Sequence, residues 1–206
     1  MSRPRPRCRL VVMARWPARG RCKRRLAVGT GLDGAARVQA ALTRHAVAVA
    51  RQVARHLELE LVLASSGIGA RASDRWAHQL GCDGALTQGR GGLGLRLQRQ
   101  VQRAFAAGVQ RLVLIGSDLP DLHCRDLEEA FAALEEVPVV LGPAHDGGYW
   151  LIGLNHPCPG LFCGVPWGGS TVLASTEALA TARNLTWKRL RRQGDLDRPA
   201  DLERWR

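Results

Sequence analysis

Two aspartates follow apolar runs of the sequence, at points where a ligand could reach them. Asp118 comes directly after residues 111–116, in Gly-Ser-Asp-Leu-Pro, and Asp146 lies within residues 141–154, just before two glycines. Glycine lacks the Cβ atom that would keep the backbone away from a ligand, so the turn at Asp146 is typical of a binding loop. Because divalent cations bridge carboxylates and phosphates, we expect Asp118 and Asp146 to bind Mg²⁺ or Mn²⁺. Asp146 is also a candidate catalytic base, and a helix cap is the alternative for Asp118.

The segment between residues 15 and 25 supplies the opposite charge. No Asp or Glu occurs in residues 1–32, while ten Arg and Lys residues crowd the first 25 positions. Such a segment attracts anions, and Lys23, one of only two lysines in the chain, is a candidate point charge on a phosphate. The alternative is a solvated basic tail, which we expect for residues 1–8. The predicted phosphate-binding residues of the loop are Arg15, Arg19, Gly20, Lys23 and Arg25.

Residues 147–176 contain no Asp, Glu, Lys or Arg. A membrane-spanning helix needs about 20 apolar residues. Seven glycines and three prolines interrupt this segment, so it does not predict a membrane span. Its aromatic side chains could line an acceptor pocket or belong to the core, and the histidine beside Asp146 could touch substrate or face solvent. The predicted acceptor-pocket residues are His145, Gly147, Gly148 and Trp167.

These residues need elements that bring them together, and the sequence alternates between strand and helix patterns. Residues 111–116 contain Leu-Val-Leu-Ile without a polar interruption, and residues 34–57 repeat apolar positions at helical spacing. Such alternation predicts an α/β fold with a mostly parallel sheet covered on both faces, and ligands then bind beyond the carboxyl ends of the strands. We expect strands at 9–14, 59–65, 85–87, 111–116, 137–141 and 149–154, helices at 34–57, 71–80, 93–107, 125–136 and 171–182, and a short C-terminal helix.

The composition is that of one domain of ordinary size. The chain of 206 residues fits a single domain spanning 1–206, because domains average about 150 residues. The net charge of +12 is almost all arginine, which a GC-rich genome produces without selection. Nucleic acid therefore ranks below a small nucleotide as the expected partner. Six cysteines without a Cys-x-x-Cys pair, and no signal peptide, indicate reduced thiols and a cytoplasmic protein.

Two literal motif matches have more ordinary explanations. Gly29–Gly34 spells a dinucleotide-binding fingerprint, but it lies well beyond the first strand, so we interpret it as a loop that leads into a helix. Asp195-Leu-Asp197 spells the Asp-x-Asp of sugar-nucleotide enzymes. It precedes Arg198-Pro-Ala-Asp201, however, which is typical of a helix start with a proline and an acid in the first turn. We favour the helix cap for this segment.

With these residues identified, the chain resembles a bacterial family of small GT-A-like proteins of the domain-of-unknown-function 2064 (DUF2064) type. The family is related more distantly to the molybdenum-cofactor guanylyltransferases and to 2-phospholactate guanylyltransferase, and some members are labelled arsenosugar-biosynthesis glycosyltransferases. Met13–Ala27 is similar to the family's Pro-x-x-Gly-x-x-Lys-Thr-Arg-Leu-Ala loop, and Gly142–Leu154 to its Gly-Pro-Ala-x-Asp-Gly-Gly-Tyr motif. Further similar segments are Gln88–Leu97, Gly116–Pro120, Val165–Val172 and Asp195–Leu202, so the resemblance covers nearly the whole chain.

The resemblance implies a nucleotide-diphospho-sugar transferase fold, a three-layer α/β/α sandwich, with a divalent metal and a nucleotide-linked substrate. By position, it implies that Lys23 and Arg25 contact phosphates and that Gln88 belongs to the nucleotide-binding residues. It also implies that Asp118 holds the metal, while Asp146 occupies a second metal or acceptor position.

Two positions depart from the family pattern. Arg24 stands where the family usually has Thr, which adds charge beside the phosphates. Gly92 stands where the family usually has Asp, which removes a carboxylate that could have bound ribose or metal. Either departure could alter the choice of nucleotide or weaken the activity.

The sequence therefore supports three functions, in order of preference. The first is a metal-dependent glycosyltransferase that moves a sugar from a nucleotide diphosphate to a small acceptor. The second keeps the fold but makes it a nucleotidyltransferase, in which a phosphorylated acceptor attacks the α-phosphate of a nucleoside triphosphate and releases pyrophosphate. The third is a non-catalytic module that binds a nucleotide or nucleic acid, suggested by the +12 charge. The donor, the acceptor and the oligomeric state stay open.

Overall fold

A seven-stranded sheet forms the centre of the protein in the computed structural model, which describes residues 8–203. The strands lie in the order β3-β2-β1-β4-β6-β5-β7. The central strand β1 (Cys8–Arg15) pairs in parallel with β2 (Glu60–Ser66) and with β4 (Arg111–Gly116). β3 (Gly84–Thr87) extends the parallel half of the sheet beyond β2.

The other half of the sheet contains the one reversed strand. β6 (Tyr149–Leu154) runs antiparallel to β4 and to β5 (Val139–Pro143), and β7 (Trp187–Arg189) lies parallel to β5 at the edge. β5 and β6 form a hairpin, and its turn carries Asp146. The sheet is therefore mostly parallel, as the sequence predicted.

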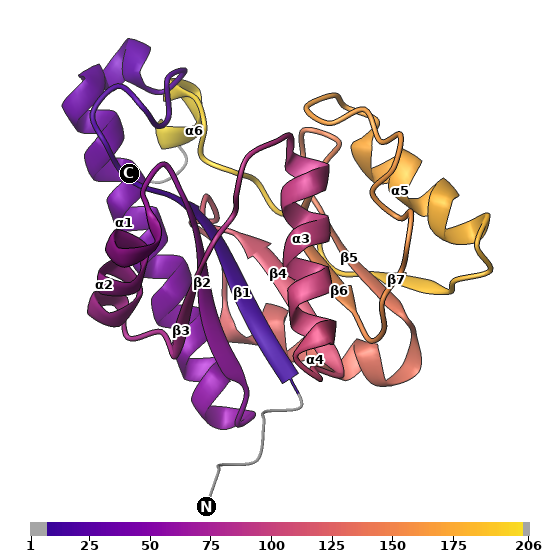
Figure 1. Ribbon diagram of the computed structural model, residues 1–206. Helices are drawn as coiled ribbons and strands as arrows, with labels where there is room; N and C mark the ends of the chain where they lie inside the picture. The colour runs from indigo at the N-terminus through magenta and orange to yellow at the C-terminus, as the bar shows by residue number, and fades with distance from the viewer. Residues whose placement is uncertain (1–7, 204–206) are drawn as a thin grey trace, which may run out of the picture.

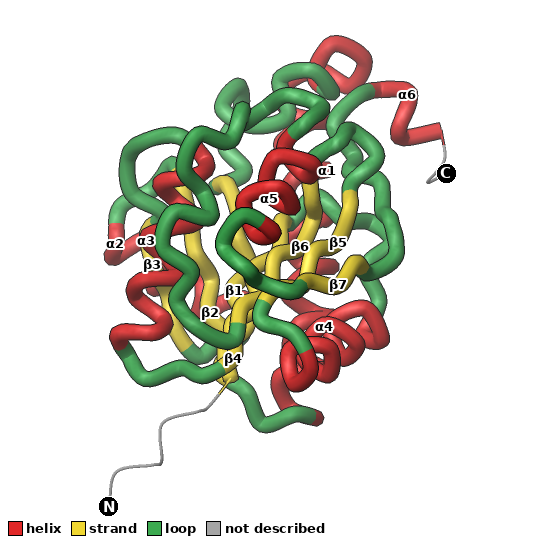
Figure 2. The backbone as a smooth tube through the Cα atoms, turned by 90° about the vertical axis from the view of Figure 1, so that its right-hand side faces the viewer, coloured by secondary structure: helices red, strands yellow, loops and turns green. Residues whose placement is uncertain are grey.

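Helices cover both faces of the sheet (Figure 1). One face packs on α1 (Ala27–His56), α2 (Ala70–Leu80) and α4 (Cys124–Glu136). The opposite face packs on α3 (Leu93–Ala106) and α5 (Val172–Thr181). Figure 2 shows the strands as a layer with α3 on one side and α4 on the other. The predicted three-layer α/β/α sandwich is confirmed.

The apolar strand runs have no polar alternation because both faces are buried. In β1, Leu10 and Val12 point toward the α1 layer, whereas Val11 between them points toward the α3 layer. All three are at most 1% exposed. Continuous apolar strands of this kind are stable only when helices shield both faces, which fixes the layer order. Because these strands are parallel, the polar residues that follow each of them lie at the same edge of the sheet.

The structure differs from the predicted elements in two places. α1 begins at Ala27 rather than at residue 34, and it contains a kink at Gly31, whose φ of 69° is left-handed. The Gly29–Gly34 segment is thus part of a kinked helix rather than a loop. β7 was not predicted, because three residues between polar neighbours give no clear periodicity.

A small third cluster joins the C-terminal segment to α1. Leu26, Leu42 and Leu196 are buried together, and α6 (Pro199–Leu202) lies beside the first turns of α1 (Figure 1). The predicted N-terminal tail, residues 1–8, lies outside the described residues except for Cys8, which begins β1. All six cysteines are free thiols. Within residues 8–203, no helix has the length and apolar character needed to cross a membrane.

Candidate active-site cleft

A cleft of about 680 Å³ opens at the carboxyl ends of the parallel strands. The volume lies in the range of small-molecule sites, about 300–1,000 Å³. Residues that follow β1, β3 and β4 reach this one place, together with the first turn of α3 and the C-terminal segment. The lining residues are Met13, Ala14, Arg15, Arg21, Lys23, Arg24, Arg25, Gln39, Ser66, Gln88, Leu93, Arg96, Gly116, Ser117, Asp118 and Asp197.

An ion pair between Lys23 and Asp118 lies at the base of the cleft. The Nζ atom of Lys23 is 2.7 Å from Oδ2 of Asp118, and the lysine side chain is only 1% exposed. The same ammonium donates to the carbonyl of Leu196, and the Leu196 N–H donates to the carbonyl of Asp118 over 3.0 Å. Lys23 has a left-handed φ of 47°. Lys23 therefore joins the β1 loop, the end of β4 and the C-terminal segment.

The second oxygen of Asp118 is held from α1. Gln39, buried on α1, donates from Nε2 to Oδ1 of Asp118 and to Oγ of Ser117, each over 3.2 Å. The Asp118 side chain remains 39% exposed, so part of the carboxylate faces the cleft. Fixed hydrogen bonds of this kind hold a carboxylate in one orientation, as a ligand-binding group requires.

The lining of the cleft is predominantly cationic. Six basic side chains and two acidic ones line the cleft, and Arg25 pairs with Asp197 over 3.1 Å. Arg15 donates to the carbonyl of Arg21 over 2.9 Å, which fixes it against the loop. A wall with this charge favours a polyanionic ligand such as a nucleotide phosphate chain.

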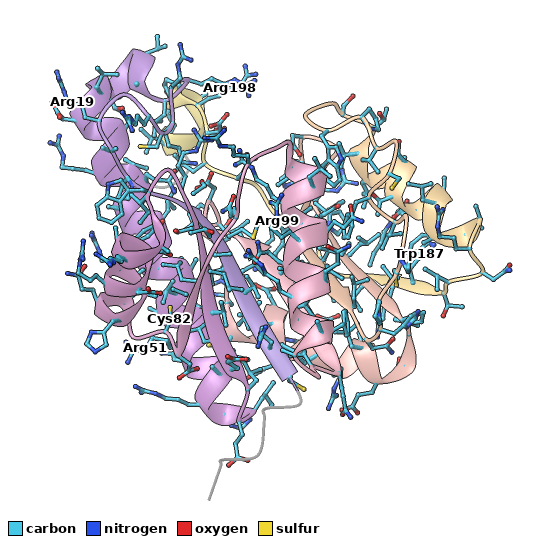
Figure 3. The ribbon with its side chains drawn as sticks, in the orientation of Figure 1. Arg19, Arg51, Cys82, Arg99, Trp187 and Arg198 are labelled. Atoms are coloured by element: carbon cyan, nitrogen blue, oxygen red, sulfur yellow. The ribbon has the colours of Figure 1, made fainter. Side chains whose placement is uncertain are left out.

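Two of the predicted phosphate-binding residues lie away from this cleft. Arg19 pairs with Asp33 over 3.2 Å, both side chains being mostly exposed, and Figure 3 shows it at the outer rim beside the start of α1. Gly20 adopts a left-handed φ of 72° and borders a smaller adjoining pocket. The loop folds back at Gly20, so Arg19 and Arg21 take different sides. The sequence could not separate them, because both are arginines in one basic run.

Gln88 presents a fixed acceptor to the cleft. It is 5% exposed, and its Nε2 donates to the carbonyls of Ala14 and Ala64, over 3.2 and 2.9 Å. Its Oε1 accepts a hydrogen bond of 3.5 Å from Nη1 of Arg96, which also lines the cleft. Nearby, Arg99 of α3 donates to the carbonyls of Gln88 and Arg90 in the same loop, and Figure 3 labels it at that helix. The predicted nucleotide-binding residue is thus in the cleft.

The Asp146 turn has quite different surroundings. Asp146 is exposed, and its Oδ1 accepts a hydrogen bond of 2.9 Å from the Gly148 N–H. Gly147 has a φ of 88°, and a Cβ atom there would lie 1.9 Å from the carbonyl oxygen of Ser170. The N–H of His145 donates to the carbonyl of Gln193 over 3.1 Å. The turn is therefore packed against two other loops, and Asp146 and His145 do not line the cleft.

Asp197 is a cleft residue that the helix-cap interpretation passed over. The cap itself is present: Asp201 accepts from the N–H groups of Asp197 and Arg198 over 2.9 and 2.7 Å. Asp197 nevertheless lines the cleft. Burial, followed by the negative charge of Asp146, raises the pKa of Asp195. The charges of Asp146, Asp197 and Lys23 all act on the Asp195 carboxyl. The Asp-x-Asp spacing was the sequence signal for the acidic side chain of Asp197 at the cleft.

Trp167, predicted for the acceptor pocket, belongs to an aromatic cluster beside α3. Its ring centroid lies 6.1 Å from that of Tyr149, in an edge-on arrangement, and 6.3 Å from that of Phe162. A Cβ atom on Gly94 of α3 would lie 2.4 Å from its indole nitrogen. Burial raises the pKa of the Tyr149 phenol far above its usual range, so Tyr149 stays neutral. The charge-free segment of residues 147–176 thus contributes to the hydrophobic core, and the Trp167 ring packs close to the start of α3.

No three His, Cys, Asp or Glu side chains in residues 8–203 gather closely enough to hold a metal by themselves. Mg²⁺, however, is commonly held by one or two carboxylates together with substrate phosphates. Asp118 and Asp197 line the same cleft and are both partly exposed, so they fit an ion of that kind better than a protein-built metal cage.

The comparisons with known proteins agree with this architecture. A family model described as uncharacterized protein conserved in bacteria (DUF2064) matches residues 47–169, more than half of the chain. The chain belongs to the DUF2064 family. The match includes β2 to β6 and both aspartates of the predicted metal site.

Among solved structures, the DUF2064 chain is similar to a protein of Desulfovibrio desulfuricans G20 described provisionally as a nucleotide-diphospho-sugar transferase. The two are 30% identical, with a TM-score of 0.83, over 96% of this chain and 85% of the other. The inositol-1-phosphate CTP transferase of T. maritima is 15% identical, with a TM-score of 0.54, over 96% of this chain and 92% of that one, which shows the fold alone.

A curated relative of the DUF2064 chain is the phosphoenolpyruvate guanylyltransferase of Sphaerobacter thermophilus. The two are 35% identical over 114 residues, which make up 53% of this chain and 52% of the relative. The chain thus spans about half the length of the curated relative that it matches. The nucleotide-diphospho-sugar transferase fold is shown, and it is a fold of transferases that act on nucleotides.

Proposed function

We propose that this protein is a nucleotidyltransferase that acts on a nucleoside triphosphate and a phosphorylated small acceptor. The observation that carries the proposal is the cationic lining of the cleft, with six basic side chains and two acidic ones. A triphosphate carries more negative charge than the diphosphate bridge of a nucleotide sugar. A wall this basic therefore suits the triphosphate better.

The reaction that fits is an attack by a phosphate oxygen of the acceptor on the α-phosphorus of the triphosphate. A new anhydride bond forms to the α-phosphorus, the bond from it to the bridging oxygen breaks, and pyrophosphate leaves with the electron pair. The arginines of the cleft would share the charge that develops on pyrophosphate, which is how positioned cations accelerate phosphoryl chemistry. Gln88 would offer its Oε1 atom to a donor on the nucleotide.

A divalent ion, Mg²⁺ or Mn²⁺, completes this proposal. Asp118 would hold it with substrate phosphates, and Asp197, which lines the same cleft, would be the second carboxylate in place of the predicted Asp146. When bound, the ion would neutralise charge on the phosphates. Lys23 would keep the Asp118 carboxylate in place from below, through the 2.7 Å ion pair.

Sugar transfer from a nucleotide diphosphate is the second candidate, and two observations favour it. Asp197 of the Asp195-x-Asp197 segment lines the cleft, and the relative from Desulfovibrio desulfuricans G20 is described provisionally as a nucleotide-diphospho-sugar transferase. The curated guanylyltransferase supports the first candidate. For either, the partners would be a nucleotide substrate and a small-molecule acceptor.

Product analysis distinguishes the two reactions. The protein is incubated with Mg²⁺ or Mn²⁺, with GTP or CTP plus phosphorylated small acids, and in parallel with nucleotide sugars. We expect pyrophosphate release in the first arm, its loss in Asp118→Asn, and its retention in Arg71→Ala, an exposed arginine on α2 outside the cleft. Release of nucleoside diphosphate from a nucleotide sugar, without pyrophosphate from any triphosphate, would overturn the proposal in favour of sugar transfer.

A further inference from the structure

The exposed large apolar side chains gather at one end of the protein. Within residues 8–203 they are Val28, Leu32, Leu57, Leu93 and Leu95. All except Leu57 lie near the start of α1 or of α3, and these helices follow the parallel strands β1 and β3, so both begin at the edge where those strands end. Single exposed leucines are ordinary in folded proteins. Their gathering at one end is the feature that needs an explanation.

The start of α1 projects from this end of the protein (Figure 1). Val28 is 88% exposed and Leu32 is 43% exposed, on either side of the kink at Gly31. On its other side the helix start packs on α6, since a Cβ atom on Gly29 would lie 2.9 Å from the side chain of Pro199. The tip of α1 is therefore held against α6 while its two apolar side chains face solvent.

The start of α3 repeats this arrangement on the other side of the sheet. Leu93 and Leu95 are 48% and 58% exposed. Gly94 between them is buried against Trp167, so the first turn of the helix is anchored and the two leucines stay outside. We call Val28, Leu32, Leu93 and Leu95 the apolar rim. Because α1 and α3 cover opposite faces of the sheet, the apolar rim lies on both sides of the edge at which the cleft opens.

Exposed arginines accompany the apolar rim without belonging to the cleft. Arg90 lies three residues before Leu93, and Arg198 directly precedes α6 beside the tip of α1. Both side chains are exposed, and neither lines the cleft. Figure 3 shows Arg198 at the same end of the protein as Arg19, whose charge is balanced by Asp33. The surface around the apolar rim is thus cationic apart from the charge that faces the nucleotide cleft.

This combination suits a lipid surface better than a protein or a nucleic acid. A stable protein interface buries about 800 Å² of continuous surface on each partner, whereas the apolar rim consists of two groups on opposite sides of the sheet edge. Nucleic acid would pair with the arginines but would gain little from aliphatic side chains. In the headgroup region of a bilayer, separate apolar side chains can each insert, and arginines attract anionic headgroups.

We propose that the apolar rim, together with Arg90 and Arg198, docks this protein reversibly on an anionic membrane surface. The attachment is peripheral, through side chains at two helix starts. In the docked protein the cleft opens toward the lipid headgroups, because it lies between the two groups of the apolar rim. This inference does not depend on the reaction that the cleft catalyses.

Co-sedimentation with vesicles tests the apolar contribution. One set of vesicles contains phosphatidylcholine alone, and the other contains phosphatidylglycerol as well. We expect the protein to bind only the anionic vesicles. Combining Val28→Ser with Leu95→Ser should weaken that binding about tenfold, because two inserted side chains are lost without a change of charge. Leu57→Ser, at the opposite end of α1, is the matched control and should leave the binding within about twofold.

A second pair of variants tests the charge. Arg90→Ser should weaken binding to the anionic vesicles about fivefold, since an arginine near such a surface contributes about 1 kcal/mol. Arg55→Ser removes the same charge from the last turn of α1, at the opposite end, and should change little. All of these side chains are exposed, so the variants should keep the melting temperature of the unmodified protein.

Four results would overturn the proposal. The first is no binding to anionic vesicles. The second is equal binding by the double variant and the unmodified protein, or an equal loss in Leu57→Ser or Arg55→Ser, because either would reduce the effect to the net charge of +12. The third is release from the vesicles by saturating GTP, which would assign the lipid to the cleft. The fourth is a dimer in sedimentation velocity that the double variant dissociates, which would assign the apolar rim to a second copy of the chain.

Discussion

Asp118 and Asp146 follow strands of one sheet, yet their surroundings make them different groups. Asp118 is held by Lys23 and Gln39 at the base of a cationic cleft. Asp146 is exposed and accepts only from Gly148 in its own turn, on the side of the sheet where the reversed strand lies. A position just beyond a strand therefore brings a carboxylate to the edge of the sheet. Contacts from distant segments then give that carboxylate an orientation and a counter-charge.

Replacing each aspartate in turn gives the largest contrast. Asp118→Asn should reduce activity about 100-fold or more, because the group that binds metal and phosphate is lost. It should also lower the free energy of unfolding by about 2 kcal/mol, since buried Lys23 loses its partner while the 39% exposed carboxylate limits the effect. Asp146→Asn should leave the stability almost unchanged. Denaturation midpoints measure the stability of the two variants, and pyrophosphate release measures their activity. An equal loss of stability in the two variants would contradict the difference between the surroundings of Asp118 and Asp146.

Gly147→Ala tests whether the Asp146 turn is a packed structural feature. The new Cβ would lie 1.9 Å from the Ser170 carbonyl oxygen at a φ of 88°, so we expect a loss of about 3 kcal/mol in stability. Gly92→Ala is the control, because its φ is ordinary and nothing lies within 4 Å of the added atom. Urea unfolding compares them. Similar midpoints for the two variants would mean that the turn is free to move.

Asp195→Asn examines the link between the two regions. Burial and the Asp146 charge raise the pKa of Asp195 in the folded protein, so the folded state binds its proton more tightly than the unfolded state. Ionised Asp195 therefore destabilises the fold, and this penalty grows as the pH rises above the unfolded carboxyl value of about 3.9. Asp195→Asn should raise the melting temperature at neutral pH, and the gain should vanish in acid. A gain that does not depend on pH would show that titration of Asp195 is not its cause.

Gly92→Asp should give the smallest change in stability, and it tests the cationic lining of the cleft near Arg96. Gly92 is the N-cap of α3 with extended backbone and no side-chain cap, so an aspartate there should stabilise the helix by about 0.3 kcal/mol. Its charge near Arg96 should weaken phosphate binding at the same time. Thermal melts and calorimetry give the two values. Stronger phosphate binding in this variant would contradict the role of Arg96 as part of a cationic cleft.

The sequence predicted the layers well because burial on both faces leaves a clear mark. Leu10, Val11 and Val12 show no polar alternation, and this alone indicates a sheet between helices. The edge at which Lys23, Gln88 and Asp118 meet follows from the same topology. These features depend on periodicity, which local sequence carries.

The remaining parts depend on contacts between distant segments, which no local pattern records. Arg19 and Arg21 are indistinguishable in sequence, and only the left-handed turn at Gly20 separates them. The helix cap at Asp201 was correct, but it concealed that Asp197 also faces the cleft. The burial of Lys23 could not be predicted either, because its partners lie 95 and 173 positions further along the chain.

The contacts of Lys23 with distant residues affect when the cleft can form during synthesis of the chain. During synthesis, β1 and the segment of residues 15–25 leave the ribosome before the rest of the sheet, and Leu196 follows only after β7 has emerged. Until then the Lys23 ammonium lacks its carbonyl partner, and the C-terminal cover over Leu26 and Leu42 is missing. The base of the cleft is therefore completed only after residue 196 has emerged, long after the loop that contributes Lys23.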